Sequence, residues 1–202
     1  MKDLNGRLYM CERPFPHFHG KKCLESDKAN ALLRWFETGV QWRFHRSHFF
    51  QLFESHLADQ QPPTGCRWLF DDNWLTPLRT RVGRLLGARL DERVLIVGHR
   101  LVPGQELCIH NDEPATGTET HRLLIQLNHG LDSDDGGDLL FFDRYDPGAV
   151  YRVWRPIHNS CVGFALSHRS FHAVTKIVKR VRYTLVISFW RAKRSHTGGK
   201  GE

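Results

Sequence analysis

The side chains with the clearest capacity for chemistry lie in the tripeptide His110-Asn111-Asp112. A histidine and an aspartate two residues apart on an extended segment point to the same side, because side chains alternate with period two. Their imidazole and carboxylate can therefore reach one metal ion. Alone the pair is a weak signal, since thirteen histidines in 202 residues make chance pairs common and a surface turn is the default interpretation.

A histidine further along the chain, His172, would complete a set of three ligands. Two imidazoles and one carboxylate on one face of an octahedron form the open site of non-haem Fe(II) oxygenases, which leaves three positions for a co-substrate and dioxygen. A histidine in an apolar strand is more often a structural residue. His172 is nevertheless preferred over His158 and His168, because it alone of the three is followed by Ala-Val and by an arginine ten residues later.

The motifs around these three residues occur in an order that resembles a known family. They are Val102-Pro103-Gly104-Gln105-Glu106-Leu107, Arg122-Leu123-Leu124-Ile125-Gln126-Leu127-Asn128, Gly136-Gly137-Asp138-Leu139-Leu140-Phe141-Phe142, Pro156, Val162-Gly163-Phe164, His172-Ala173-Val174, Arg182-Tyr183-Thr184 and Phe189-Trp190. Over residues 93–190 the chain resembles the prolyl hydroxylase-like branch of the Fe(II)/2-oxoglutarate-dependent oxygenases. The combination is specific, because Arg182 stands where that family places the arginine that binds the co-substrate.

The resemblance implies that Arg182 binds the distal carboxylate of 2-oxoglutarate, because a guanidinium offers two parallel hydrogen bonds where a lysine offers only a point charge. Thr184, two residues further on the same strand, shares that face and can donate to the same carboxylate. Arg180 faces that way too by parity, and it is the alternative if a bulge shifts the register. Gln126 faces the interior by alternation, at a position where the family often carries a polar group that contacts the co-substrate.

One position departs from the family pattern. Leu101 stands nine residues before the first metal histidine, where a tyrosine is common, so another donor must complete the co-substrate pocket. His99 shares its face. Further candidates at the rim of the site are Arg100, Glu119, Thr120 and Arg122, although a solvated charge is the commoner fate for each.

The resemblance implies hydroxylation of an unactivated C–H bond in an amino acid, a peptide or a protein side chain. Fe(II), 2-oxoglutarate and O2 would be required, with succinate and CO2 as products, and ascorbate is a further candidate cofactor. Asp112 argues against halogenation, because halogenases of this superfamily carry a small residue in place of the carboxylate. Neither the prime substrate nor the oligomeric state can be read from the sequence.

Two alternatives belong to other functional classes. The formal net charge of +7 would suit a nucleic-acid-directed dioxygenase, or a non-catalytic jelly-roll module that binds an acidic partner. However, the basic residues are scattered outside the segment 191–200, and the chain lacks a visible base-stacking or lesion-reading motif, so nucleic acid is not favoured. A binding module would have no need of His110, Asp112, His172 and Arg182 together.

The first half of the chain is predicted to be mainly helical. Apolar residues at helical spacing predict a helix over 26–39, a second short helix over 48–57, and a third that begins at Thr76-Pro77 and ends at Gly87. Residues 60–65 contain two prolines and predict a loop. The nearby aromatic residues Trp68, Phe70 and Trp74 are interpreted as core residues.

Residues 1–23 are broken by Pro14, Pro16 and Gly20, so they are predicted to be irregular and to form a lid or a docking arm. This segment also carries Cys11, His17, His19 and Cys23. A zinc site remains an alternative for these four, although their spacing matches no CxxC-type site.

From Glu92 onwards the chain consists of short β-rich runs separated by turn residues, at 93–101, 107–109, 123–128, 139–142, 151–154, 160–165 and 181–190. They predict a double-stranded β-helix, the jelly roll of cupins and of the family named above. The predicted fold class is therefore mainly β with N-terminal helices that pack on one sheet. Within one structural domain, residues 1–91 would form an arm and helical elaboration, 92–193 the catalytic core and 194–202 a disordered tail.

A cytoplasmic protein without a membrane partner is predicted. No segment approaches 18 consecutive apolar residues, and residues 1–10 carry charges where a signal peptide would be apolar. The five cysteines are odd in number and widely spaced, which argues against a disulfide framework.

Overall fold

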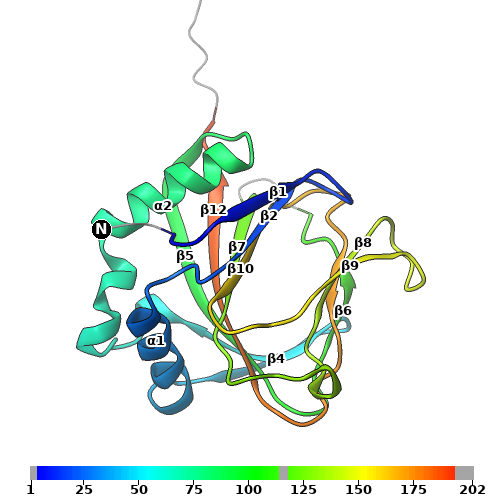
Figure 1. Cartoon of the computed structure of the whole chain (residues 1–202), viewed down its shortest axis with the longest axis horizontal. Helices are drawn as coiled ribbons and strands as arrows, with labels where there is room; N and C mark the ends of the chain where they lie inside the picture. The colour runs from blue at the N-terminus through cyan, green and yellow to red at the C-terminus, as the bar shows by residue number, and fades with distance from the viewer. Residues whose placement is uncertain (1–3, 114–117, 194–202) are drawn as a thin grey trace, which may run out of the picture.

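The short strands of the second half form the frame of two facing antiparallel sheets (Figure 1). The computed structural model describes residues 4–113 and 118–193. In the large sheet the strand order is β1 (Leu8–Cys11), β2 (His17–Lys21), β10 (Ser160–Ala165), β7 (His121–Gln126), β12 (Arg182–Arg191), β5 (Leu90–Leu101), β4 (Gln51–His56) and β3 (Arg43–Arg46). In the small sheet it is β6 (Leu107–His110), β11 (His172–Val174), β8 (Leu139–Phe142) and β9 (Val150–Trp154).

This is the predicted jelly-roll architecture, and the fold class is confirmed. Strands β8 and β10 have the predicted bounds, and the bounds of β5, β6, β7, β9 and β12 differ from prediction by one to three residues. The predicted tail, 194–202, lies outside the described residues. No helix in the described part of the chain is long and apolar enough to cross a membrane.

The helices cover the outer face of the large sheet, as predicted. Helix α1 (Ser26–Thr38) buries an apolar stripe, and α2 (Asp72–Leu85) buries a second one, both against outward side chains of β7 and β12. The 3-10 helices η1 (Leu57–Asp59) and η2 (Thr64–Phe70) lie between α1 and α2 in the chain, and η3 (Ser133–Asp135) precedes β8. Trp74 is buried in this core, and Trp68 and Phe70 pack against it.

The prediction of an irregular lid or arm over residues 1–23 is wrong for residues 8–11 and 17–21, which form strands, and residues 1–3 lie outside the described residues. Strands β1 and β2 form a hairpin that extends the large sheet, with β2 hydrogen-bonded to β10. Phe18 of β2 is fully buried opposite Gly163 of β10, where a Cβ atom would lie only 2.3 Å from the Phe18 ring. The partner that makes this segment a strand lies some 140 residues away in the sequence (Phe18↔Gly163), so local pattern could not reveal it.

The helix predicted over 48–57 is also wrong. Residues 51–56 form β4, which pairs with β5 on one side and β3 on the other. Pairing with β5 and β3 outweighs the helical spacing of the apolar residues in this segment. Strand β3 was not predicted.

The start of the third helix needs a smaller correction. The Asp71 side chain accepts a hydrogen bond from the backbone N–H of Asn73 at 2.8 Å, which makes Asp71 the N-cap in place of Thr76. Pro77 therefore lies inside α2.

The metal-free protein should lose stability in acid partly because of His121, which is 1 % exposed. Burial lowers the pKa of His121 from 6.5 to about 4. The unfolded chain therefore binds more protons than the folded protein between these values, so the free energy of unfolding falls as pH drops from 6.5 towards 4. One such group accounts for at most about 1.4 kcal/mol per pH unit.

Urea unfolding of the metal-free protein at pH 7 and pH 4.5 measures this effect. We expect His121→Phe, which keeps a ring in the core, to lose less stability over that interval than the parent. His168→Gln, at an exposed position, is the matched control and should follow the parent. An unchanged loss in His121→Phe would show that other groups cause the acid sensitivity.

Candidate active site

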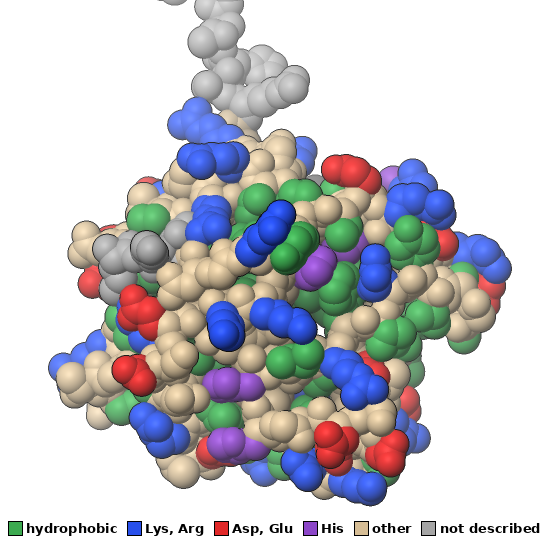
Figure 2. Space-filling model, viewed as in Figure 1, with side chains coloured by type: hydrophobic (Ala, Val, Ile, Leu, Met, Phe, Trp, Pro, Cys, Tyr) green, Lys and Arg blue, Asp and Glu red, His purple; other side chains and the backbone are tan. Residues whose placement is uncertain are grey.

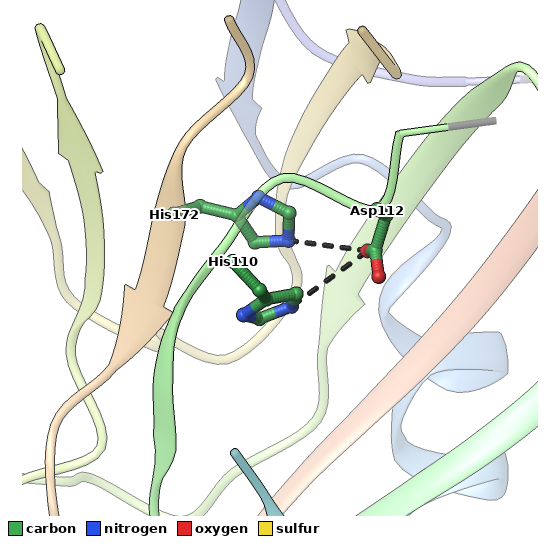
Figure 3. A group of neighbouring side chains, drawn as sticks. All are labelled: His110, Asp112 and His172. Atoms are coloured by element: carbon green, nitrogen blue, oxygen red, sulfur yellow. Dashed lines mark ion pairs between the residues drawn. The ribbon is translucent and has the colours of Figure 1, made fainter. Parts of the chain in front are cut away.

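The three predicted ligands converge at one end of the space between the sheets (Figure 3). His110 is the last residue of β6 and His172 the first of β11. They are cross-strand partners, and their ring centroids lie 4.2 Å apart. The Asp112 Oδ2 atom lies 3.7 Å from His110 Nε2 and 3.4 Å from His172 Nε2. Within residues 4–113 and 118–193 this is the one group of three His, Cys, Asp or Glu side chains placed to share an ion.

The path of the backbone differs from the expected extended segment. Strand β6 stops at His110, and Asp112 adopts a left-handed φ of 50° in the turn that follows. The turn is braced by Ser170, whose hydroxyl donates to the Asn111 carbonyl at 2.8 Å. The two side chains therefore meet through a turn and not through strand alternation.

Both imidazoles are oriented by backbone carbonyls. His110 Nδ1–H donates to the Cys108 carbonyl and His172 Nδ1–H to the Ser170 carbonyl, each at 2.7 Å. Because a carbonyl only accepts, each Nε2 carries the lone pair and faces Asp112. Metal-binding histidines are commonly held in this way, so the orientation of the two rings is compatible with metal binding through Nε2.

Burial and neighbouring groups also determine the protonation of His110 and Asp112. Burial, followed by the nearby His172, lowers the pKa of His110 to about 4, so this ring is neutral at pH 7. Burial alone would raise the pKa of Asp112, but the close approach of His172 and the positive charge of Arg122 hold it well below its usual range. A neutral imidazole beside an ionised carboxylate is the form that binds a divalent cation. Two nitrogens and one oxygen donor fit Fe(II).

A small cavity of about 40 Å³ connects this cluster to the predicted co-substrate residues. It is lined by His99, Leu107, His110, Arg122, Leu124, Leu139, His172, Val174, Arg182 and Thr184. His110, His172 and Arg182 thus face one space, although they lie on strands of different sheets.

Arg182 is 2 % exposed, and neither its Nε nor its Nη2 has a hydrogen-bond partner among the described residues. Burial lowers the pKa of this guanidinium to about 10, against the opposing effect of Asp138. Room for it comes partly from Gly137, where a Cβ atom would lie 2.9 Å from Arg182 Cδ and where φ is 78°. A buried guanidinium with unpaired donors is costly unless an anion completes it, so a carboxylate ligand fits here.

Thr184 and Gln126 lie beside each other on β12 and β7, both buried. The Thr184 hydroxyl donates to Gln126 Oε1 at 3.0 Å, so its hydrogen is used within the protein. Thr184 lines the cavity, whereas Gln126 is not among the lining residues. His99 is the Cα partner of Thr184 on β5 and lines the same cavity, with its Nε2 atom 3.2 Å from Glu54 Oε2.

Arg180 does not face the cavity. It is exposed, donates to the Gly130 carbonyl at 2.9 Å and lies 3.6 Å from Asp135. The parity argument fails because β12 begins only at Arg182.

The rim residues differ from the expectation of solvated charges. The Arg122 side chain is 15 % exposed, lines the cavity, and contacts both Asp112 and Glu119. The Arg100 guanidinium lies over the Phe53 ring, and the Thr120 hydroxyl accepts from the Arg191 N–H at 2.7 Å.

Two residues near the site were missed by sequence reasoning. The Phe49 ring lies 5.3 Å from that of His110, and Glu54 orients His99. Both fall in the segment 48–57 that was predicted to be a helix, so no local signal connected them with the site.

Cys11, His17, His19 and Cys23 take other positions. Cys11 and His17 are paired across β1 and β2, and the His19 ring packs on Trp154. The thiols of Cys23 and Cys161 contact each other, and all five cysteines of the chain are free.

Residues 96–190 match the model of the family described as the 2OG-Fe(II) oxygenase superfamily. No curated protein matches the sequence significantly. Among solved structures, a Pseudomonas putida prolyl-4-hydroxylase has a TM-score of 0.69 at 20 % identity, over 88 % of this chain and 93 % of that one. These values describe a shared fold.

Two further solved structures are similar. A Trichoplax adhaerens prolyl hydroxylase, in complex with a peptide fragment of the hypoxia inducible factor oxygen degradation domain, has a TM-score of 0.68 at 18 % identity, over 87 % of this chain and 83 % of that one. A viral collagen prolyl hydroxylase from Paramecium Bursaria Chlorella virus-1, solved with 2OG, has a TM-score of 0.61 at 12 % identity, over 86 % and 94 %.

Proposed function

Because residues 96–190 of this chain belong to the 2OG-Fe(II) oxygenase superfamily, we propose that the protein is an Fe(II)/2-oxoglutarate-dependent dioxygenase that hydroxylates an amino acid, a peptide or a protein side chain. One observation carries the proposal. The convergent ligands His110, Asp112 and His172 share a cavity with the buried Arg182, whose guanidinium has unpaired donors.

The protein groups have separate tasks. His110, Asp112 and His172 would hold the iron, and Arg182 would bind the distal carboxylate of 2-oxoglutarate. When bound, the iron supplies the oxidising chemistry in which 2-oxoglutarate and O2 yield succinate and CO2. Four apolar side chains of the cavity wall exclude water between the two ends, namely Leu107, Leu124, Leu139 and Val174.

The finer assignments are supported by more limited observations. A peptide or protein substrate is supported by the peptide bound to the Trichoplax relative. Nucleic acid is not favoured, because Lys and Arg side chains are spread over the face seen in Figure 2 with Asp and Glu among them. Ascorbate as a cofactor and a cytoplasmic location stay predictions.

Mass spectrometry tests the proposal. The protein is incubated with Fe(II), 2-oxoglutarate, O2 and ascorbate in the presence of a peptide library and free amino acids, and we expect one product heavier by one oxygen atom together with an equal amount of succinate. Samples without 2-oxoglutarate serve as controls. Oxygen transfer that did not require 2-oxoglutarate, or a complete absence of succinate across substrates, would contradict the proposed reaction.

A further inference from the structure

Arg122 contacts two carboxylates beside the candidate metal site. Its Nη1 atom hydrogen-bonds to Asp112 Oδ2, the same oxygen that faces the two histidines, and its Nη2 atom pairs with Glu119 Oε1 at 2.8 Å. Its Nε atom is buried without a hydrogen-bond partner in the described part of the chain. One guanidinium is thus shared between a candidate metal ligand and a second carboxylate.

The sheet fixes where this guanidinium can be. Arg122 lies on β7 in the centre of the large sheet. Its cross-strand partners are Phe164 of β10 on one side and Ser188 of β12 on the other. Phe164 in turn packs against His172, with ring centroids 5.1 Å apart. The backbone position of Arg122 is therefore fixed, while its guanidinium can still exchange one carboxylate partner for another.

The contact with Arg122 compensates the charge of the Asp112 carboxylate when no metal is bound. Asp112 is largely buried, and an ionised carboxylate in such a place is unfavourable without a counter-charge. Arg122 provides this charge at the oxygen atom that a metal ion would use. The two cations repel each other and need the same oxygen, so metal binding must weaken the contact between Arg122 and Asp112.

We propose that Arg122 is the counter-ion of Asp112 in the metal-free protein and competes with the metal for that carboxylate, so that it sets the metal affinity of the site. Glu119 retains the guanidinium when the metal takes Oδ2. The inference rests on the metal site of the proposed function and adds to it a residue that lowers affinity for the ion. A residue that only positioned Asp112 would raise this affinity instead.

Titration with Mn²⁺ alone, followed by the electron paramagnetic resonance signal of the free ion, measures the effect without turnover. Removing the competing charge-assisted bond in Arg122→Leu should tighten Mn²⁺ binding about ten- to a hundred-fold. The melting temperature of the metal-free variant should fall below that of the parent, and saturating Mn²⁺ should close most of that difference. Arg122→Lys keeps the charge and should stay close to the parent.

A second variant keeps the test decisive if Arg122→Leu fails to fold. Glu119→Gln removes the alternative partner and leaves Arg122 to Asp112, so Mn²⁺ binding should become weaker, in the opposite direction. Weaker binding in Arg122→Leu, or unchanged affinity in the variants that fold, would overturn the inference and leave the proposed function intact. If the parent itself bound no Mn²⁺, the metal site and the proposed function would be wrong as well.

Discussion

Asp112→Ala should abolish 2-oxoglutarate-dependent turnover while leaving the fold intact. The substitution removes the only carboxylate of the cluster, and the two imidazoles of His110 and His172 alone do not make the three-ligand face that iron needs. Folding should survive because Arg122 keeps its second partner, Glu119, at 2.8 Å. The Arg122 guanidinium is therefore not left unpaired.

Succinate formation, Mn²⁺ binding and the circular dichroism spectrum measure the three parts of this prediction. Asp134→Ala, at an exposed position of η3, is the matched control and should behave as the parent in all three. Turnover at the parent rate in Asp112→Ala would show that the metal site has been assigned to the wrong residues. Loss of the folded spectrum would instead show that Asp112 is needed for structure.

Local sequence pattern predicted the regular strands of the second half of the chain. Strands β8 and β10 each carry a short apolar run between turn residues, and their bounds were predicted to the residue. Helix α1 shows an apolar stripe and ends at Thr38, directly before Gly39, so its limits could be predicted from local sequence. Segments whose structure depends on a distant partner could not be predicted. Strand β2 needs Gly163 opposite Phe18, and β4 needs the edge of β5.

The candidate site also has residues that the sequence predicted and contacts that it could not predict. His110, Asp112, His172 and Arg182 were named from spacing and from the resemblance, and the structure places three of them around one point and the fourth in the adjoining cavity. The contact between Arg122 and Asp112 could not be predicted, because it joins a strand residue to a residue in a left-handed turn. The pair of His99 and Glu54 joins β5 to a strand that local spacing had predicted as a helix.

Arg182→Lys should weaken 2-oxoglutarate binding and leave metal binding unchanged. Lysine keeps the positive charge but loses the planar pair of N–H groups that match a carboxylate. A charge-assisted hydrogen bond contributes about 1.5 to 3 kcal/mol, so the apparent affinity should fall roughly ten- to a hundred-fold. Arg182 begins β12 and is not one of the three candidate metal ligands, and its Nε and Nη2 have no partner among the described residues, so the loss should fall on the co-substrate.

Titration of 2-oxoglutarate against succinate formation, with Mn²⁺ binding measured in parallel, separates the two arginines near the start of β12. Arg180→Lys is the matched control, because Arg180 is exposed and bonded to the Gly130 carbonyl outside the cavity. We expect parent-like affinity for 2-oxoglutarate in this control and a large loss in Arg182→Lys. The opposite result, an unchanged affinity in Arg182→Lys and a large loss in Arg180→Lys, would move the co-substrate contact to Arg180. It would also mean that the unpaired donors of Arg182 serve another anion.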